Sequence, residues 1–211
     1  MGDFLEIVRL FGPWVCQFLY TICFIPQIIH NYRCKFGTGI SEFFLIGYLN
    51  VYIALLYYVF LCNMPLAYKS MGVLQLLATL ILIYQRLYYN GRFTNRLWLF
   101  YVLNIILGLA VLPLAFKYPI SVGLMGGWVM LLVGSVNQLP QIFKIYKEKN
   151  TAGFSLFFVV ITALAGITEV TLSILLQFPM QTLLSSSRVA IIALIFCFQF
   201  WWYRKNNKCA I

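Results

Sequence analysis

The sequence contains a long internal duplication, and this feature limits the possible folds more than any other. The dipeptide Pro-Gln occurs at Pro26-Gln27 and again 114 residues later, at Pro140-Gln141. Positions that are identical at this offset include Gly12 and Gly126, Trp14 and Trp128, Tyr32 and Tyr146, Ser41 and Ser155, and Gln85 and Gln199. A period of this length exceeds that of solenoid repeats. It predicts two homologous halves with a ligand site at their interface.

The composition indicates that lipid surrounds these halves. Apolar residues make up 63% of the chain and charged residues 9%, and a globule of 211 residues has too little interior for so much apolar surface. Since about 20 apolar residues span a bilayer as a helix, the charge-free runs predict seven membrane helices. We expect them near residues 7–30, 41–62, 71–89, 97–116, 120–143, 156–178 and 186–203.

Seven helices and one duplication predict an all-α membrane protein in a 3+1+3 arrangement of two parallel triple-helix bundles. The first repeat is expected at 1–93 and the second at 119–211. The helix within 94–118 has no repeat partner and is expected to connect them. Because one connecting helix returns the chain to its starting side, the repeats face the same way and are related by an axis along the membrane normal.

The basic residues predict the orientation. Eleven of the fifteen Lys and Arg residues fall on one side of this arrangement. The positive-inside rule therefore predicts an amino terminus outside or in a lumen and a carboxyl terminus in the cytoplasm. The membrane is expected to be a bacterial inner membrane or a eukaryotic endomembrane such as that of a lysosome or vacuole. The net charge of +10 indicates contact with lipid headgroups and gives no indication of nucleic acid binding.

Both Pro-Gln motifs lie inside a hydrophobic helix, about one turn from its cytoplasmic end. Each proline ring removes an N–H donor and bends the helix. A fixed structural bend is one interpretation, but duplication at equivalent positions favours a hinge or gate made of Pro26, Gln27, Pro140 and Gln141.

Polar residues at helical spacing predict the faces that line a central pathway, since an amide facing lipid would lack partners. The residues expected to bind the solute are Tyr20, Asn50, Gln85, Asn137, Glu169 and Gln199. The alternative is that these side chains only join helices to one another.

Glu169 is the only carboxylate deep within a predicted span. A charge at this depth costs roughly 2.5–3.5 kcal/mol, so it is expected to face a partner or a water-filled cavity. It binds the cationic end of a substrate or takes up a coupled proton; the structural alternative is an ion pair with Arg188 or another outer cation. Arg9 and Arg188 could form a cationic rim opposite it, but the sequence favours extension of both towards headgroups.

Catalytic chemistry is not indicated. The six cysteines lack zinc-like spacing, and a single histidine leaves little room for hydrolysis. We therefore expect no enzyme activity, no catalytic residue, no metal and no cofactor.

The segments that surround the two motifs resemble PQ-loop repeats. Phe24-Ile-Pro-Gln-Ile-Ile-His-Asn-Tyr is followed by Gly39-Ile-Ser41, and Gln138-Leu-Pro-Gln-Ile-Phe-Lys-Ile-Tyr by Gly153-Phe-Ser155. The resemblance implies small-solute transporters related to SWEET and cystinosin, with the motif prolines as hinges, and with the KDEL receptor as a cousin in fold. Where chains similar to cystinosin carry a membrane aspartate in the sixth helix, this chain has Thr162.

These observations together predict an alternating-access transporter of a small polar or zwitterionic solute, most simply an amino acid or a related metabolite. Protons are a possible second partner, and the oligomeric state is left open. The alternative is a receptor of the KDEL type that binds a peptide without transport through Arg9, Lys69, Arg188 and Glu169. A scaffold without flux is a third possibility.

Overall fold

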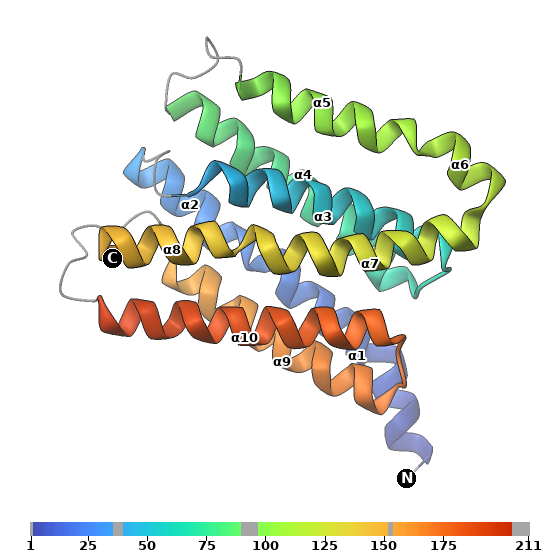
Figure 1. Ribbon diagram of the computed structural model, residues 1–211. Coiled ribbons are helices and arrows are strands. Elements are labelled where there is room, and N and C mark those ends of the chain that lie inside the picture. Colours follow the sequence, from blue (N-terminus) through green and yellow to red (C-terminus); the bar gives the residue numbers. More distant parts are fainter. Residues whose placement is uncertain (1, 36–39, 90–96, 152–153, 204–211) are drawn as a thin grey trace.

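The protein is helical throughout the residues that its computed structural model describes, which are 2–35, 40–89, 97–151 and 154–203. Figure 1 shows the helices lying side by side in one bundle. Its helices within these ranges are α1 (Gly2–Ile22), α2 (Phe24–Cys34), α3 (Glu42–Leu61), α4 (Leu66–Tyr89), α5 (Leu97–Ala110), α6 (Leu112–Lys117), α7 (Pro119–Asn137), α8 (Leu139–Glu148), α9 (Leu156–Leu175) and α10 (Met180–Trp202).

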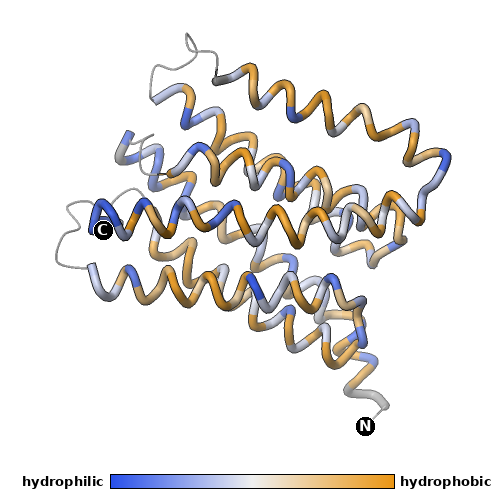
Figure 2. The backbone as a smooth tube through the Cα atoms, viewed as in Figure 1, coloured by the Kyte–Doolittle hydropathy of each residue, from blue (hydrophilic) through white to orange (hydrophobic). Residues whose placement is uncertain are grey.

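Among the described residues, seven helical segments are long and apolar enough to cross a membrane, which confirms the number of spans predicted from the sequence. They comprise 5–33, 42–61, 66–89, 98–117, 119–148, 156–175 and 180–202. Hydrophobic residues dominate the middle of the helices, and hydrophilic ones gather at the ends (Figure 2). Three predicted boundaries were wrong by five residues or more: the third span starts at Leu66 instead of 71, the fifth ends at Glu148 instead of 143, and the seventh starts at Met180 instead of 186.

We call the side on which α2, α8 and α10 end the C face, and the side on which α3 and α9 end the N face (Figure 1). The described basic residues at the helix ends follow this division. Arg33 and Lys147 lie in the last turns of α2 and α8 at the C face, and Lys117 lies at the end of α6 at the N face. Five other basic residues of the prediction lie outside the described residues: Arg92, Arg96, Arg204, Lys205 and Lys208.

The duplication extends to the helix boundaries. Shifting α3 by 114 residues gives 156–175, the bounds of α9, and shifting α4 gives 180–203, against Met180–Trp202 for α10. The first span breaks at Cys23 and the fifth at Gln138, so that Pro26 and Pro140 fall in the first turns of α2 and α8. The backbone at both breaks stays right-handed, so each span bends without reversing.

Helices from the two halves pack against each other along two seams. One seam joins α3 to α7 and the other joins α1 to α9, whereas α5 and α6 lie at the edge of the bundle against α3 and α7 (Figure 1). Glycines allow the close approach of α3 and α7. A Cβ atom at Gly126 would lie 2.7 Å from the carbonyl oxygen of Ala54, and one at Gly123 would lie 2.7 Å from the Cys62 sulfur.

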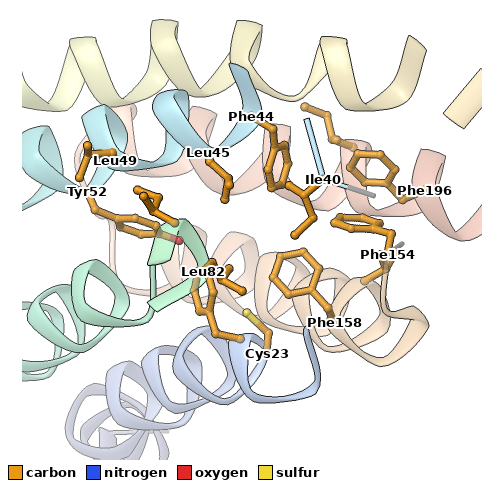
Figure 3. Packing of buried hydrophobic residues seen from close by; sticks show 14 of the residues in the cluster. Cys23, Ile40, Phe44, Leu45, Leu49, Tyr52, Leu82, Phe154, Phe158 and Phe196 are labelled. Carbon is orange, nitrogen blue, oxygen red and sulfur yellow. The ribbon is translucent and has the colours of Figure 1, made fainter. Parts of the chain in front are cut away.

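An aromatic cluster fills the C-face half of the bundle. We call Phe24, Phe44, Phe154, Phe158 and Phe196 the aromatic plug; all five are at most 4% exposed. Figure 3 shows four of these rings gathered between helices with Ile40 and Leu82. Phe154 lies 5.1 Å from Phe196 and 5.3 Å from Phe158 between ring centroids, within the range of favourable aromatic pairs. The plug separates the centre of the protein from the C face.

Candidate functional site

A cavity with a volume of about 90 Å³ lies on the N-face side of the aromatic plug. This volume holds a few water molecules. Its walls come from α1, α2, α3, α4, α7, α9 and α10, so both halves of the duplication contribute. The polar residues that line it are Gln17, Tyr20, Tyr48, Tyr52, Tyr58, Tyr68, Gln75, Asn137, Gln138, Thr162, Glu169, Thr182, Ser185 and Arg188.

Glu169 reaches this cavity from α9. Its residue is 9% exposed, and its helix face carries the small residues Thr162, Ala165 and Gly166. A Cβ atom at Gly166 would lie 2.8 Å from the backbone nitrogen of Ala190, so glycine allows α9 and α10 to touch at this level. The carboxylate is thus held inside the bundle, at a depth where a charge requires a polar surrounding.

Arg188 enters the same cavity from α10, and the expectation that it extends to the headgroups was wrong. Because α10 begins at Met180, Arg188 lies more than two turns inside the helix. Its guanidinium rests against Gly134, near the middle of the 119–148 span, where any larger residue would displace it. One guanidinium nitrogen donates to Ser185 Oγ at 3.3 Å. Within the described parts of the chain, Nε and Nη1 have no hydrogen-bond partner.

The two opposite charges face a common space without joining. No ion pair within 4.0 Å connects the described side chains of Glu169 and Arg188. Among the described residues, Asn137 Oδ1 in the cavity wall also has no hydrogen-bond partner. Buried polar atoms without partners are costly. This arrangement therefore suits a polar occupant that bears both charges.

The motif glutamines lie beyond the cavity and connect the two halves. Gln27 Oε1 accepts the backbone N–H of Ser155 at 2.7 Å, and Gln141 Oε1 accepts that of Ser41, also at 2.7 Å. Ser155 and Ser41 are the residues that precede α9 and α3. Each motif glutamine thus binds the start of a helix in the opposite half. We call these two hydrogen bonds the reciprocal caps.

Three of the six predicted solute-binding residues, Tyr20, Asn137 and Glu169, line the cavity. The other three have partners elsewhere. Asn50 donates to Asn104 Oδ1 of α5 at 2.9 Å. Gln85 donates to the carbonyl of Ile28 at 3.1 Å, and Gln199 donates to that of Ile142 at 3.0 Å, which are equivalent bonds in the two halves.

Sequence reasoning missed several residues of the cavity wall. Tyr48 and Tyr52 of α3 are absent from the predicted set, although they pack against each other with ring centroids 5.6 Å apart. Gln17 and Gln75 were also missed, and Gln75 Nε2 donates to Gln17 Oε1 at 3.3 Å. Both glutamines lie inside apolar spans, where a polar residue indicates a buried face, so their positions carried a usable signal.

Metal binding has no support in the described residues, where no group of three or more His, Cys, Asp or Glu side chains converges. The candidate site is the polar cavity that both halves of the duplication line.

The repeated units match a known family at both copies. The PQ loop repeat matches residues 11–66 and 122–182, which together make up more than half of the chain. The chain belongs to the PQ-loop family. PQ-loop proteins are membrane proteins, and the family includes transporters.

This PQ-loop protein is also similar to an uncharacterised protein of Schizosaccharomyces pombe. The two are 31% identical over 161 residues, which is 70% of this chain and 56% of the yeast protein. The chain thus matches little more than half the length of this relative.

Proposed function

We propose that the protein is an alternating-access transporter of a small polar or zwitterionic solute, most simply an amino acid. The observation that carries this proposal is the pair of opposite charges, Glu169 and Arg188, that face one cavity without forming an ion pair. Buried charges of this kind are costly unless an occupant compensates them. The cavity lies between repeated units, where transporters of this construction bind their solutes.

The proposed transporter has a 3+1+3 arrangement of two parallel triple-helix bundles, with repeats at 1–93 and 119–211 and a connecting helix within 94–118. The matching bounds of α3 and α9 and the edge position of α5 and α6 support this division. The basic residues favour a C face in the cytoplasm and an N face outside the cell or in a lumen.

Two layers close the cavity in this conformation. Towards the C face lie the aromatic plug and the reciprocal caps. Towards the N face, Tyr58 Oη and Thr182 Oγ1 are 3.1 Å apart, and Tyr68 packs on Phe178 with ring centroids 5.8 Å apart. Fewer contacts close the cavity on the N-face side than on the C-face side. We therefore infer that the cavity opens first towards the N face.

Uptake into vesicles tests the proposal. The purified full-length protein is reconstituted into liposomes, and uptake of radiolabelled amino acids, sugars and organic acids is compared with that of empty liposomes. Saturable uptake of at least one solute is the expected result. Binding without flux would identify a receptor instead, and the absence of both would overturn the transporter.

Pro26→Ala and Pro140→Ala are expected to slow flux roughly tenfold while the equilibrium affinity for the solute changes much less. Each proline removes a helical N–H donor, which lowers the cost of bending during the change between states. Initial uptake rates and binding isotherms measure the two effects separately. Pro113→Ala is the matched control, because Pro113 lies at the start of α6, where the connecting span is also broken. It should leave the uptake rate and the affinity unchanged. An equal loss of flux and affinity would argue against hinging.

Glu169→Gln is expected to weaken solute binding and to abolish the pH dependence of the uptake that remains at high solute concentration. We assign the coupled proton to this carboxylate because it is the acidic residue in the cavity wall within the described segments. Uptake by wild type and variant is measured across a range of pH with and without an imposed gradient. Unchanged pH dependence would remove Glu169 as the coupling group. The titratable groups that face it are Cys16, Tyr20, Tyr52, Tyr58, Tyr68 and Arg188.

A further inference from the structure

The cavity wall also restricts the charge of the solute. In the part of the chain that the structure describes, the wall contains one carboxylate, Glu169, and one guanidinium, Arg188; its other residues are uncharged. A solute with one positive and one negative group would find a counter-charge for each. A third charge on the solute would be buried without a partner, which is strongly unfavourable.

The hydrogen-bonding groups divide in the same way as the charges. On the α7 and α10 side, Arg188 has donors at Nε and Nη1 without a hydrogen-bond partner among the described residues, and a guanidinium donates strongly to carboxylate oxygens. On the α1 and α9 side, the Glu169 carboxylate faces Tyr20 and accepts hydrogen bonds from an ammonium. The cavity therefore has an end for an anion and an end for a cation.

Part of the cavity wall is apolar and aromatic. It includes Phe24 and Phe158, whose ring centroids are 5.8 Å apart, together with Val51, Leu55 and Met130. Such a surface favours an uncharged, apolar side chain on the solute.

On the basis of the proposed transport function, we propose that the solute is a neutral amino acid, with its carboxylate on Arg188 and its ammonium on Glu169. Both charged residues come from the second half of the duplication. Their equivalents at the 114-residue offset are Leu55 and Leu74, so the first half supplies no charge at these positions. The two charged ends of the solute are thus bound by the second half, and tyrosines of the first half line the rest of the cavity.

The test uses L-leucine and two analogues that each lack one charged end. 3-Methylbutylamine keeps the ammonium and lacks the carboxylate, whereas 4-methylpentanoate keeps the carboxylate and lacks the ammonium. Binding is measured on the purified full-length protein in detergent by calorimetry. Each analogue is expected to bind about 10- to 100-fold more weakly than leucine, because each loses a charge-assisted hydrogen-bonding group. L-Lysine and L-glutamate are expected to bind at least as weakly as these analogues.

Two variants assign each end of the solute to one residue. In Glu169→Gln, leucine and 4-methylpentanoate should bind within about threefold of each other, because the ammonium has lost its partner. In Arg188→Gln, the same convergence should occur between leucine and 3-methylbutylamine. Glu6→Gln and Arg33→Gln remove the same charges from exposed positions and should preserve the wild-type ratios.

The measured quantity is the ratio of the affinities for leucine and its analogue on the same variant, so partial loss of folded protein does not change it. Each variant is first checked for elution as a monodisperse peak. The inference would be overturned if the wild type bound either analogue as tightly as leucine. It would also be overturned if both variants still bound leucine much more tightly than the analogues. Failure of the inference differs from failure of transport. Liposomes that take up a sugar or an organic acid but not leucine would refute the neutral amino acid and preserve the transporter, whereas liposomes that take up no solute would refute the transporter.

Discussion

Gly126→Leu is expected to prevent the protein from folding into its native bundle. The glycine lies on α7 at the seam with α3, where a Cβ atom would be 2.7 Å from the Ala54 carbonyl oxygen and 3.3 Å from the Tyr58 backbone nitrogen. Both neighbours are backbone atoms, so no rotamer change can make space. A leucine would force α3 and α7 apart along a seam that also carries part of the cavity wall. Size-exclusion chromatography in mild detergent should show aggregation or loss of the monodisperse peak.

A smaller substitution at the same glycine is expected to destabilise the protein less. Gly126→Ala should lower the free energy of unfolding by about 1–3 kcal/mol, as overpacking does in a close interface. Gly72→Ala is the matched control, because its Cβ would lie 3.3 Å from the end of the Leu56 side chain, which can move. There the better helix propensity of alanine, about 1 kcal/mol, should leave stability unchanged or raised. Equal melting temperatures for the two alanine variants would contradict the steric account.

Much of the fold could be predicted from the sequence because the bilayer imposes simple requirements. Charge-free runs of about 20 residues predict spanning helices, and the repeated Pro-Gln motif indicated the internal duplication. The start of α10 could not be placed in the same way. Ser185, Ser186, Ser187 and Arg188 resemble a polar loop in a hydropathy profile, but two of these side chains face the cavity. A hydropathy profile does not distinguish a loop from the polar, cavity-lining face of a buried helix.

The candidate site was partly predictable for a related reason. Glu169 stood out because a lone carboxylate inside a span is costly. Tyr48 and Tyr52 did not, because an amphipathic ring is common on any membrane helix. The partner of Gln141 is a backbone N–H 100 residues away, at Ser41. Side-chain periodicity gives the direction of the glutamine but cannot identify the atom that it meets.

The double variant Gln27→Leu, Gln141→Leu is expected to open the C face. Each substitution removes one reciprocal cap and leaves the buried N–H donor of Ser155 or the partly buried one of Ser41 without this partner. A lost partner of this kind costs about 1–3 kcal/mol. In the proposed cycle the caps exist only while the C face is closed. The loss of both would therefore shift the equilibrium towards the open state by a factor of roughly 30 to 10⁴.

Thiol labelling measures this shift. Cys23 lies beside the aromatic plug and is 2% exposed, so an impermeant maleimide applied from the C face should reach it only when the plug opens. In a background without the other cysteines, the labelling rate should rise at least tenfold in the double variant. Gln199→Leu is the control, because it removes a bond to Ile142 within the same half and should leave the rate unchanged. If the double variant is less stable but labels at the wild-type rate, the caps hold the two halves together without gating the pathway. Transport would then have to open the C face by separating the rings of the plug while both glutamines remain bound.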